Sequence, residues 1–287
     1  MMNYYIVDAF TDKPFGGNQA GVVLLDSDTF PKDELMIDIA AELRYSETAF
    51  VRHDGEKEFS IRYFTPKAEV DLCGHATIAS FFLLNRKGQA SGQCICHTKA
   101  GDLQIEAGTK VMMQMAKTRI VATLNNTGEI YKALGANDYG HAMPVQVVCS
   151  GLPDIMVPLP DVTTLNRLVP DMDAIKAITQ KHDAVSFHVF ALPSQAIEHS
   201  HNQIITAFVR DFAPLYDIPE ESATGTANAS LTYYLQQCGH IPAEARCTFL
   251  QGEAMGRPSV IATHILPDGN IFVGGTAAIV AEGKITV

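Results

Sequence analysis

Basic residues are scarce in this 287-residue chain, which has 21 Lys and Arg against 32 Asp and Glu. The formal net charge is −11 at pH 7, and no cluster of Lys and Arg interrupts the acidic balance. Nucleic acids and anionic membrane surfaces both attract a basic footprint. The composition therefore argues against either partner, although a helix N-terminus can still hold one small carboxylate.

Long apolar runs and paired cysteines are also lacking. No stretch approaches the roughly 20 apolar residues that cross a bilayer, and the opening MMNYYIVDAF lacks the regions of a signal peptide. The six cysteines form no CxxC pair, so we expect a reducing, cytoplasmic setting. Cys94 and Cys96 are interpreted as buried thiols of a strand, because metal clips usually use two-residue spacing.

The chain does contain an internal repeat. RYFTP at 62–66 recurs as RDFAP at 210–214, an offset of 148 residues. CGHA at 73–76 aligns with TGTA at 224–227, an offset of 151, so the second copy carries three extra residues. Apolar runs, TIASFFLL and NASLTYYL, follow both. Two matches in the same order, about half the chain apart, predict duplicated domains.

Periodicity predicts more strands than helices. Strands are expected at 4–7, 21–25, 47–51, 59–64, 91–97, 102–107, 111–116, 146–149, 155–158, 186–191, 204–210, 271–273 and 277–280. Helices are expected at 31–43, after Cys73, at 169–180 and at 227–237. TIASFFLL is apolar on nearly every face and must be buried. We predict an α+β fold in which each half wraps a curved mixed or antiparallel sheet around a central helix.

The predicted domains are residues 1–118 and 119–276, with the strand at about 277–287 returning to the first domain. Gly74 and Gly225 stand at the starts of the two central helices. Glycine lets a ligand approach the backbone closely, and the first N–H groups of a helix favour an anion. Two such starts facing one cleft would cradle a carboxylated molecule.

Glu47 is a candidate general acid/base because it opens a strand of apolar residues, where it would be partly desolvated. His75 lies in the first turn of the first central helix, and Glu221 lies just before the second. The alternatives are ordinary structural roles: a solvated strand-edge charge for Glu47, a satisfied core histidine for His75 and a helix-capping acid for Glu221.

Four motifs in order carry a family resemblance: VDAFTDKPFGGNQAGVV at 7–23, SETAFV at 46–51, DLCGHAT at 71–77 and ATGTA at 223–227. Together with the tail GNIFVGGTAAIVAEGKITV, they resemble the PhzF family of phenazine-biosynthesis-like isomerases. The resemblance implies two diaminopimelate epimerase-like domains related by a pseudo-two-fold, with the active site in the cleft between them. It also implies a homodimer that uses neither a metal nor an organic cofactor.

The resemblance also assigns site residues. Glu47 would carry the proton, with His75 and Glu221 as further catalytic residues; Glu221 stands where the family usually has Asp, and Thr226 where it has Ser. Substrate contacts are expected from Asn18, Cys73, Gly74, Thr224, Gly225 and Thr226. The predicted function is a cofactor-independent biosynthetic isomerase that moves a proton within a small carboxylated, cyclic metabolite.

Two other functions stay open. Epimerases of this fold use two cysteines, one at each helix start, and Cys73 fills the first position. Thr224 fills the second, and an unactivated hydroxyl cannot act as a base near neutral pH, so a racemase or epimerase would depend on Cys73. The third hypothesis is a non-catalytic protein that binds a ligand or a partner on the same fold.

Overall fold

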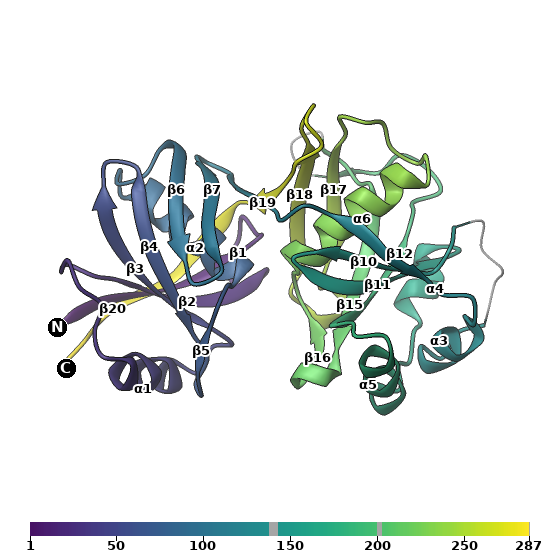
Figure 1. The fold of residues 1–287 in the computed structure, drawn as a ribbon, viewed down its shortest axis with the longest axis horizontal. Helices are drawn as coiled ribbons and strands as arrows, with labels where there is room; N and C mark the ends of the chain where they lie inside the picture. The colour runs from purple at the N-terminus through teal and green to yellow at the C-terminus, as the bar shows by residue number, and fades with distance from the viewer. Residues whose placement is uncertain (138–142, 200–202, 287) are drawn as a thin grey trace. The chain divides into compact units, whose positions relative to one another are not determined.

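The computed structural model describes residues 1–137, 143–199 and 203–286. The chain forms two compact units: unit 1 is Met1–Gln114 with Gly274–Val287, and unit 2 is Met115–Val273. Each unit contains a sheet and a central helix, shown in Figure 1 as α2 (Gly74–Arg86) and α6 (Gly225–Gln237). This architecture confirms the predicted α+β class.

Unit 1 is built on nine strands of the part that the structure describes. They are β1 (Met2–Ala9), β2 (Asn18–Leu24), β3 (Thr48–Gly55), β4 (Glu58–Phe64), β5 (Glu69–Val70), β6 (Gly92–Thr98), β7 (Gly101–Ala107), β8 (Val111–Gln114) and β20 (Ala277–Ile285). The last strand, β20, pairs antiparallel with β1 over its whole length. Helix α1 (Asp33–Leu43) packs its Met36, Ile39 and Ala40 against the sheet.

Unit 2 carries the remaining elements of the described residues. Its strands are β9 (Arg119–Thr123), β10 (Gln146–Ser150), β11 (Leu152–Leu159), β12 (Ser186–Ala191), β13 (Glu198–His199), β14 (Gln203–Ile204), β15 (Ala207–Ala213), β16 (Ile218–Glu221), β17 (Arg246–Gln251) and β18 (Ser259–Ile265), and β19 (Ile271–Gly275) runs on into unit 1. Besides α6 it has α3 (Gly128–Ala133), α4 (Val162–Asn166), α5 (Met172–Lys181) and two 3-10 turns, η2 (Pro214–Tyr216) and η3 (Glu253–Met255).

The two units share one order of strand pairing. In unit 1, β2 runs parallel to β3, β3 antiparallel to β4, and β4 parallel to β6, which turns back as β7. In unit 2, β11, β12, β15, β17 and β18 repeat that order with the same directions. The repeat that was seen in the sequence therefore extends to the topology.

The repeated RxFxP segments build the same local structure. Arg62 donates from Nε and Nη2 to both oxygens of Glu69, and Arg210 does the same to Glu220. Such two-point pairing fixes the planes of both groups. It ties β4 to β5 and β15 to β16, the strands that lead into α2 and α6. The 3-10 turn η2 lies in the second of these connections, where the sequence has its three extra residues.

Helices α2 and α6 are buried on nearly every side, as their composition predicts. In α2 the buried positions include Ala76, Ile78, Phe81 and Leu84. Helix α2 contacts β1, β2, β3, β7, β8 and β20, and α6 contacts β9, β10, β11 and β18. Each helix is therefore held along its length by the sheet of its own unit, which fixes where its first turn lies.

Several predicted bounds are wrong. Ile204 belongs to β14, and the strand expected at 204–210 is β15, Ala207–Ala213. The helix expected from residue 169 begins at Met172, because the Asp171 side chain caps it by accepting from the Ala174 N–H at 3.0 Å. Strand β8 ends at Gln114, and α6 begins two residues early, at Gly225.

Candidate active site

One cluster of predicted site residues lies at the start of α2, in unit 1. The Glu47 carboxylate is 3.3 Å from Nε2 of His75, and their side chains are 19% and 7% exposed. Glu47 stands immediately before β3, and the Gly21 N–H donates to its carbonyl at 3.1 Å. Its backbone is thus anchored to β2, so its side chain projects from a rigid strand start.

The imidazole of His75 is surrounded by polar side chains. Asn18 Nδ2 lies 3.3 Å from Nδ1, and Ser46 Oγ lies 3.5 Å from Nε2. The Cys73 sulfur lies 3.5 Å from Nδ1 and 3.7 Å from Nε2. The structure therefore brings Asn18, Glu47, Cys73 and His75 together in one unit.

Burial lowers the pKa of His75, and the attraction of the Glu47 carboxylate opposes this only in part. The imidazole is therefore neutral at pH 7. A neutral imidazole beside a carboxylate can accept or donate a proton without first losing one to solvent.

The α2 start presents backbone N–H groups that its own N-cap does not occupy. Cys73 is the N-cap residue in extended conformation, and its side chain makes no capping hydrogen bond. Thr77 is the first residue whose N–H bonds within the helix, to the Cys73 carbonyl at 3.0 Å. By contrast, α5 is capped by Asp171. An uncapped buried helix start is suited to an anion supplied by a ligand.

A separate cluster of predicted site residues lies at the start of α6, in unit 2. Thr224 is an N-cap with nearly the same backbone angles as Cys73, and it too makes no side-chain cap. Its hydroxyl donates to Asp211 Oδ2 at 2.6 Å and accepts from Gln251 Nε2 at 3.1 Å. The Thr224 hydroxyl is therefore held in place between Asp211 and Gln251.

Glu221 ends β16 and is paired in register with Asp211 of β15. Its carbonyl accepts from Gln251 Nε2 at 2.8 Å, and the same amide bridges to Thr224. Glu221, Thr224 and Thr226 are half-buried, and Gly225 is buried. The structure therefore groups the predicted residues of unit 2 around the α6 start, as it groups those of unit 1 around α2.

A buried polar cluster near the start of α6 was not predicted from the sequence. Asp154, Ser186, His188 and Asp211 are each at most 1% exposed. Asp211 accepts from Ser186 at 2.7 Å, from His188 Nδ1 at 3.1 Å and, at its other oxygen, from Thr224. The sequence contained one indication of this cluster. In the repeated RxFxP segment, the second copy has the acidic residue Asp211 where the first copy has the aromatic residue Tyr63.

Asp154 of this cluster has a raised pKa. Ser186 Oγ lies 2.9 Å from Asp154 and 2.7 Å from Asp211, but one hydroxyl can donate only one proton. Burial, then repulsion by Asp211, raises the pKa of Asp154 well above its usual range. A protonated Asp154 would donate to Ser186, which would in turn donate to Asp211.

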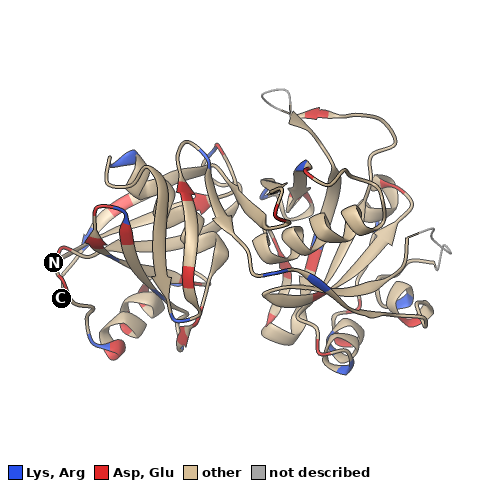
Figure 2. Cartoon of the chain, turned by 45° about the horizontal axis from the view of Figure 1, so that its top comes forward, with Lys and Arg blue, Asp and Glu red and all other residues tan. Residues whose placement is uncertain are grey.

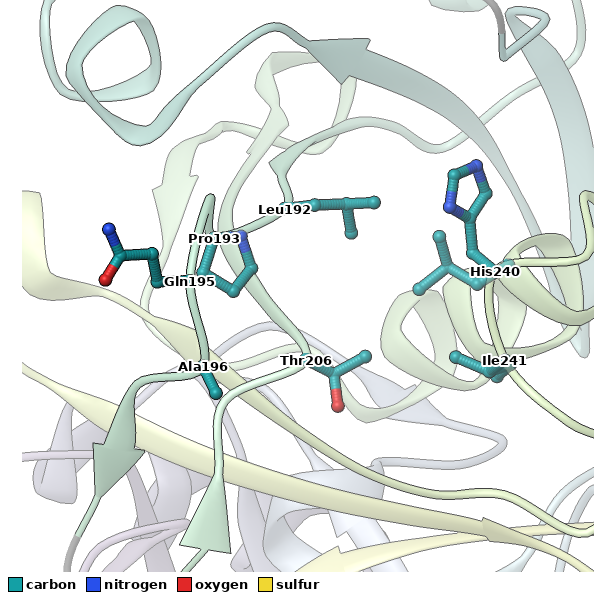
Figure 3. A pocket seen from close by; sticks show the side chains of 8 residues that line it. Leu192, Pro193, Gln195, Ala196, Thr206, His240 and Ile241 are labelled. Carbon is teal, nitrogen blue, oxygen red and sulfur yellow. The ribbon is translucent and has the colours of Figure 1, made fainter.

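A surface hollow of about 250 Å³ lies in unit 2 (Figure 3). Leu192, Thr206, Leu235 and His240 are among its lining residues. Leu235 belongs to the last turn of α6, so the hollow lies at the opposite end of that helix from Thr224. It contains no carboxylate, and we do not assign the chemistry to it.

The distribution of charged residues and the apolar length of the helices agree with what the sequence predicts. Figure 2 shows Lys and Arg dispersed among the more numerous Asp and Glu. Within the described ranges, no helix is long and apolar enough to cross a membrane. Cys94 and Cys96 are buried in β6, as predicted, and burial raises the pKa of Cys96 to about 12.

Comparison with known proteins extends over the whole chain. The family model of phenazine biosynthesis-like proteins, PhzC-PhzF, matches residues 7–283. The uncharacterized isomerase YddE of Escherichia coli K12 is 31% identical over 98% of this chain and 97% of its own. An uncharacterized isomerase of Deinococcus radiodurans is 32% identical over 99% of this chain and 94% of its own.

Solved structures share the fold. A PhzF-family protein of Bacillus anthracis aligns over 100% of this chain and 99% of its own, with a TM-score of 0.86 at 24% identity. A probable proline racemase of Agrobacterium radiobacter K84 covers 100% of this chain and 93% of its own, with a TM-score of 0.61 at 10% identity. The architecture is thus one that isomerases and racemases use.

These observations define an enzyme of the isomerase class, in which Glu47 and His75 lie together at the start of a sheet-wrapped helix. The chain belongs to the phenazine biosynthesis-like, or PhzC-PhzF, family. This confirms the resemblance that its motifs carry.

Proposed function

We propose that this chain is a cofactor-independent isomerase that moves a proton from one carbon to another within a small carboxylated, cyclic metabolite. Glu47 takes up the proton and returns it. The observation that carries the proposal is the placement of the Glu47 carboxylate, 3.3 Å from the buried His75 at an uncapped helix start. A largely desolvated carboxylate on a rigid strand start suits general acid/base catalysis.

The helix start supplies the complementary charge. Removing a proton next to a carboxylate builds negative charge on the substrate, and backbone N–H groups fixed in advance stabilise it. The first turn of α2 offers such groups beside Glu47. In the family arrangement, α6 and Glu221 would act on the same substrate from the second domain; that cleft and the homodimer stay predictions.

The test is proton exchange in heavy water. The protein is incubated in D₂O with a panel of cyclic amino and hydroxy acids, and deuterium incorporation is followed by NMR and mass spectrometry. For any substrate found, Glu47→Gln should lower the exchange rate by at least about 10³-fold, because the amide cannot accept the proton.

Glu56→Gln serves as the matched control, since Glu56 is an exposed glutamate in the β3–β4 turn. It should exchange at the wild-type rate, and circular dichroism should show both variants folded. Wild-type exchange by folded Glu47→Gln would overturn the assignment of Glu47.

A second candidate, a racemase or epimerase that uses Cys73, is favoured by one contact, the 3.5 Å approach of its sulfur to His75. The Cys73→Ser variant distinguishes the Glu47 mechanism from the Cys73 mechanism, because serine is itself a good N-cap and helix α2 should persist. We expect Cys73→Ser to keep exchange within about tenfold of wild type. Loss comparable to that of Glu47→Gln would favour the thiol mechanism instead.

A further inference from the structure

Three ligand atoms of different chemistry converge at the α2 start. A glutamate oxygen, a cysteine sulfur and a histidine nitrogen, from Glu47, Cys73 and His75, all lie within 4.8 Å of one another. In the part of the chain that the structure describes, this is the one cluster of three such groups. We propose that it binds Zn²⁺, and that the bound ion is a reversible inhibitor of the enzyme.

The spacing matches tetrahedral zinc. Bonds of about 2.0–2.1 Å to nitrogen and oxygen and about 2.3 Å to sulfur place tetrahedral N and O ligands about 3.3 Å apart, and N and S ligands about 3.6 Å apart. The corresponding distances are 3.3 Å from His75 Nε2 to Glu47 and 3.7 Å from Nε2 to Cys73. Two of the three ligand-to-ligand distances thus match tetrahedral zinc, and the Glu47 oxygen and the Cys73 sulfur lie within 4.8 Å of each other.

The ligand set also fits in charge. A carboxylate and a thiolate contribute two negative charges, and a neutral imidazole contributes the third bond without competing for the site with a proton. The positive end of α2 disfavours a cation, but it equally favours the thiolate form of a cysteine at a helix start.

The surroundings provide a second shell. Zinc-bound histidines usually present their other ring nitrogen to an oxygen, which fixes the orientation of the ring. Asn18 lies 3.3 Å from Nδ1, and its side-chain amide oxygen and nitrogen can exchange places by a flip. With three protein ligands, the fourth position of the ion remains open to water or to a small carboxylate.

Occupation of the site would stop proton transfer. A carboxylate that is bound to zinc no longer accepts a proton from carbon, so the ion would compete with the proposed role of Glu47. Zinc binding goes beyond the proposed function and does not depend on it, because it follows from the ligand geometry alone. The inhibitory role rests on the proposed function of Glu47.

The chain supplies its own control. The triplet Cys-Gly-His at 73–75 occurs a second time, at 238–240. Cys238 and His240 line a hollow with Ile120, Met143, Pro144, Gln146 and Gln237, which includes no carboxylate. If a cysteine and a histidine two residues apart were sufficient, the second triplet would bind zinc equally well.

The experiment is metal titration of the EDTA-treated full chain. Zn²⁺ is followed by calorimetry, and Co²⁺ by the near-ultraviolet band of its bond to thiolate. We expect one tight site per chain. Cys73→Ser should abolish the Co²⁺–thiolate band and weaken Zn²⁺ binding at least about 100-fold, because losing a direct ligand costs no less than losing an outer-shell partner. Glu47→Gln should weaken Zn²⁺ binding while leaving the band, and Cys238→Ser should bind as wild type.

Wild-type binding by Cys73→Ser, loss of binding in Cys238→Ser, or no binding by the wild-type chain would each overturn the proposal. None of these readouts requires a substrate, so they are separate from the deuterium test of Glu47. Where a substrate is found, Zn²⁺ should stop deuterium exchange and EDTA should restore it. Full exchange at saturating Zn²⁺ would overturn the inhibitory role.

Discussion

Asp154 shows how one buried carboxyl can dominate the response of a protein to pH. In the folded chain its pKa is raised well above the usual value by burial and by Asp211. In the unfolded chain an aspartate ionises at about pH 3.9. Between these values the unfolded state has released a proton that the folded state retains, so raising the pH destabilises the fold.

Asp154→Asn should remove this sensitivity, because an amide can still donate to Ser186 but cannot ionise. We expect the melting temperature of the variant to rise relative to wild type as the pH increases from 5 to 8, by several degrees at pH 8. Calorimetry over this range measures it. Asp38→Asn, at an exposed position of α1, is the control; parallel curves for wild type and Asp154→Asn would contradict the protonated state.

The residues found by sequence reasoning and those missed differ in a physical way. Glu47, Cys73 and His75 lie at element ends, where polar side chains and glycine turns break the apolar pattern and can be recognised. Asp154, Ser186 and His188 lie in the buried stretches of β11 and β12. Pairing between strands that are distant in the sequence brings them together, and no local pattern encodes it.

Among the elements, the start of α2 lies beside the candidate catalytic side chains. Gly74 is the first residue of this helix. A methyl group added at Gly74 would meet Met113 Cε at 3.6 Å, an ordinary contact. The fold therefore does not require glycine there, and alanine favours a helix by up to about 1 kcal/mol. The glycine is better explained by the approach of a ligand to the backbone.

Gly74→Ala should accordingly keep or raise the melting temperature while it lowers the deuterium exchange rate about 10- to 100-fold, because a displacement of about 1 Å is costly in a positioned site. Gly128→Ala is the matched control, since Gly128 is the first residue of α3 with open space around its Cα. A wild-type deuterium exchange rate in Gly74→Ala would show that Gly74 is needed only for the backbone turn before α2.

Helices and strands were predicted correctly where one sequence pattern was strong. The central helices were recognised because apolar side chains cover nearly all their faces. Helices α3 and α4 were missed because they have only six and five residues, too few to show a period. Strands β17 and β18 were missed although their residues alternate or are buried.

At the scale of the whole molecule, unit 1 depends on two distant parts of the chain. Strand β1 pairs with β2 on one side and with β20 on the other. Removing residues 277–287 would leave the backbone groups of one edge of β1 unpaired. Unit 2 lies within Met115–Val273 and has its own apolar core.

We therefore expect this truncation to loosen unit 1 selectively. Hydrogen exchange followed by mass spectrometry should show faster exchange in β1, β2 and α2, while β10–β12 and α6 remain protected. Equal loss of protection in both units would indicate that they unfold as one cooperative body. Unchanged protection of β1 would contradict the importance of the β20 pairing.

The position of β20 also has a consequence for biosynthesis. Ribosomes deliver a chain from its N-terminus, and domains generally fold as units as they emerge. Residues 115–273 can close their core as soon as they leave the exit tunnel, but strand β1 must wait for β20. The unit bearing Glu47 and His75 is thus begun before unit 2 and completed after it, so its sheet stays incomplete until β20 has emerged.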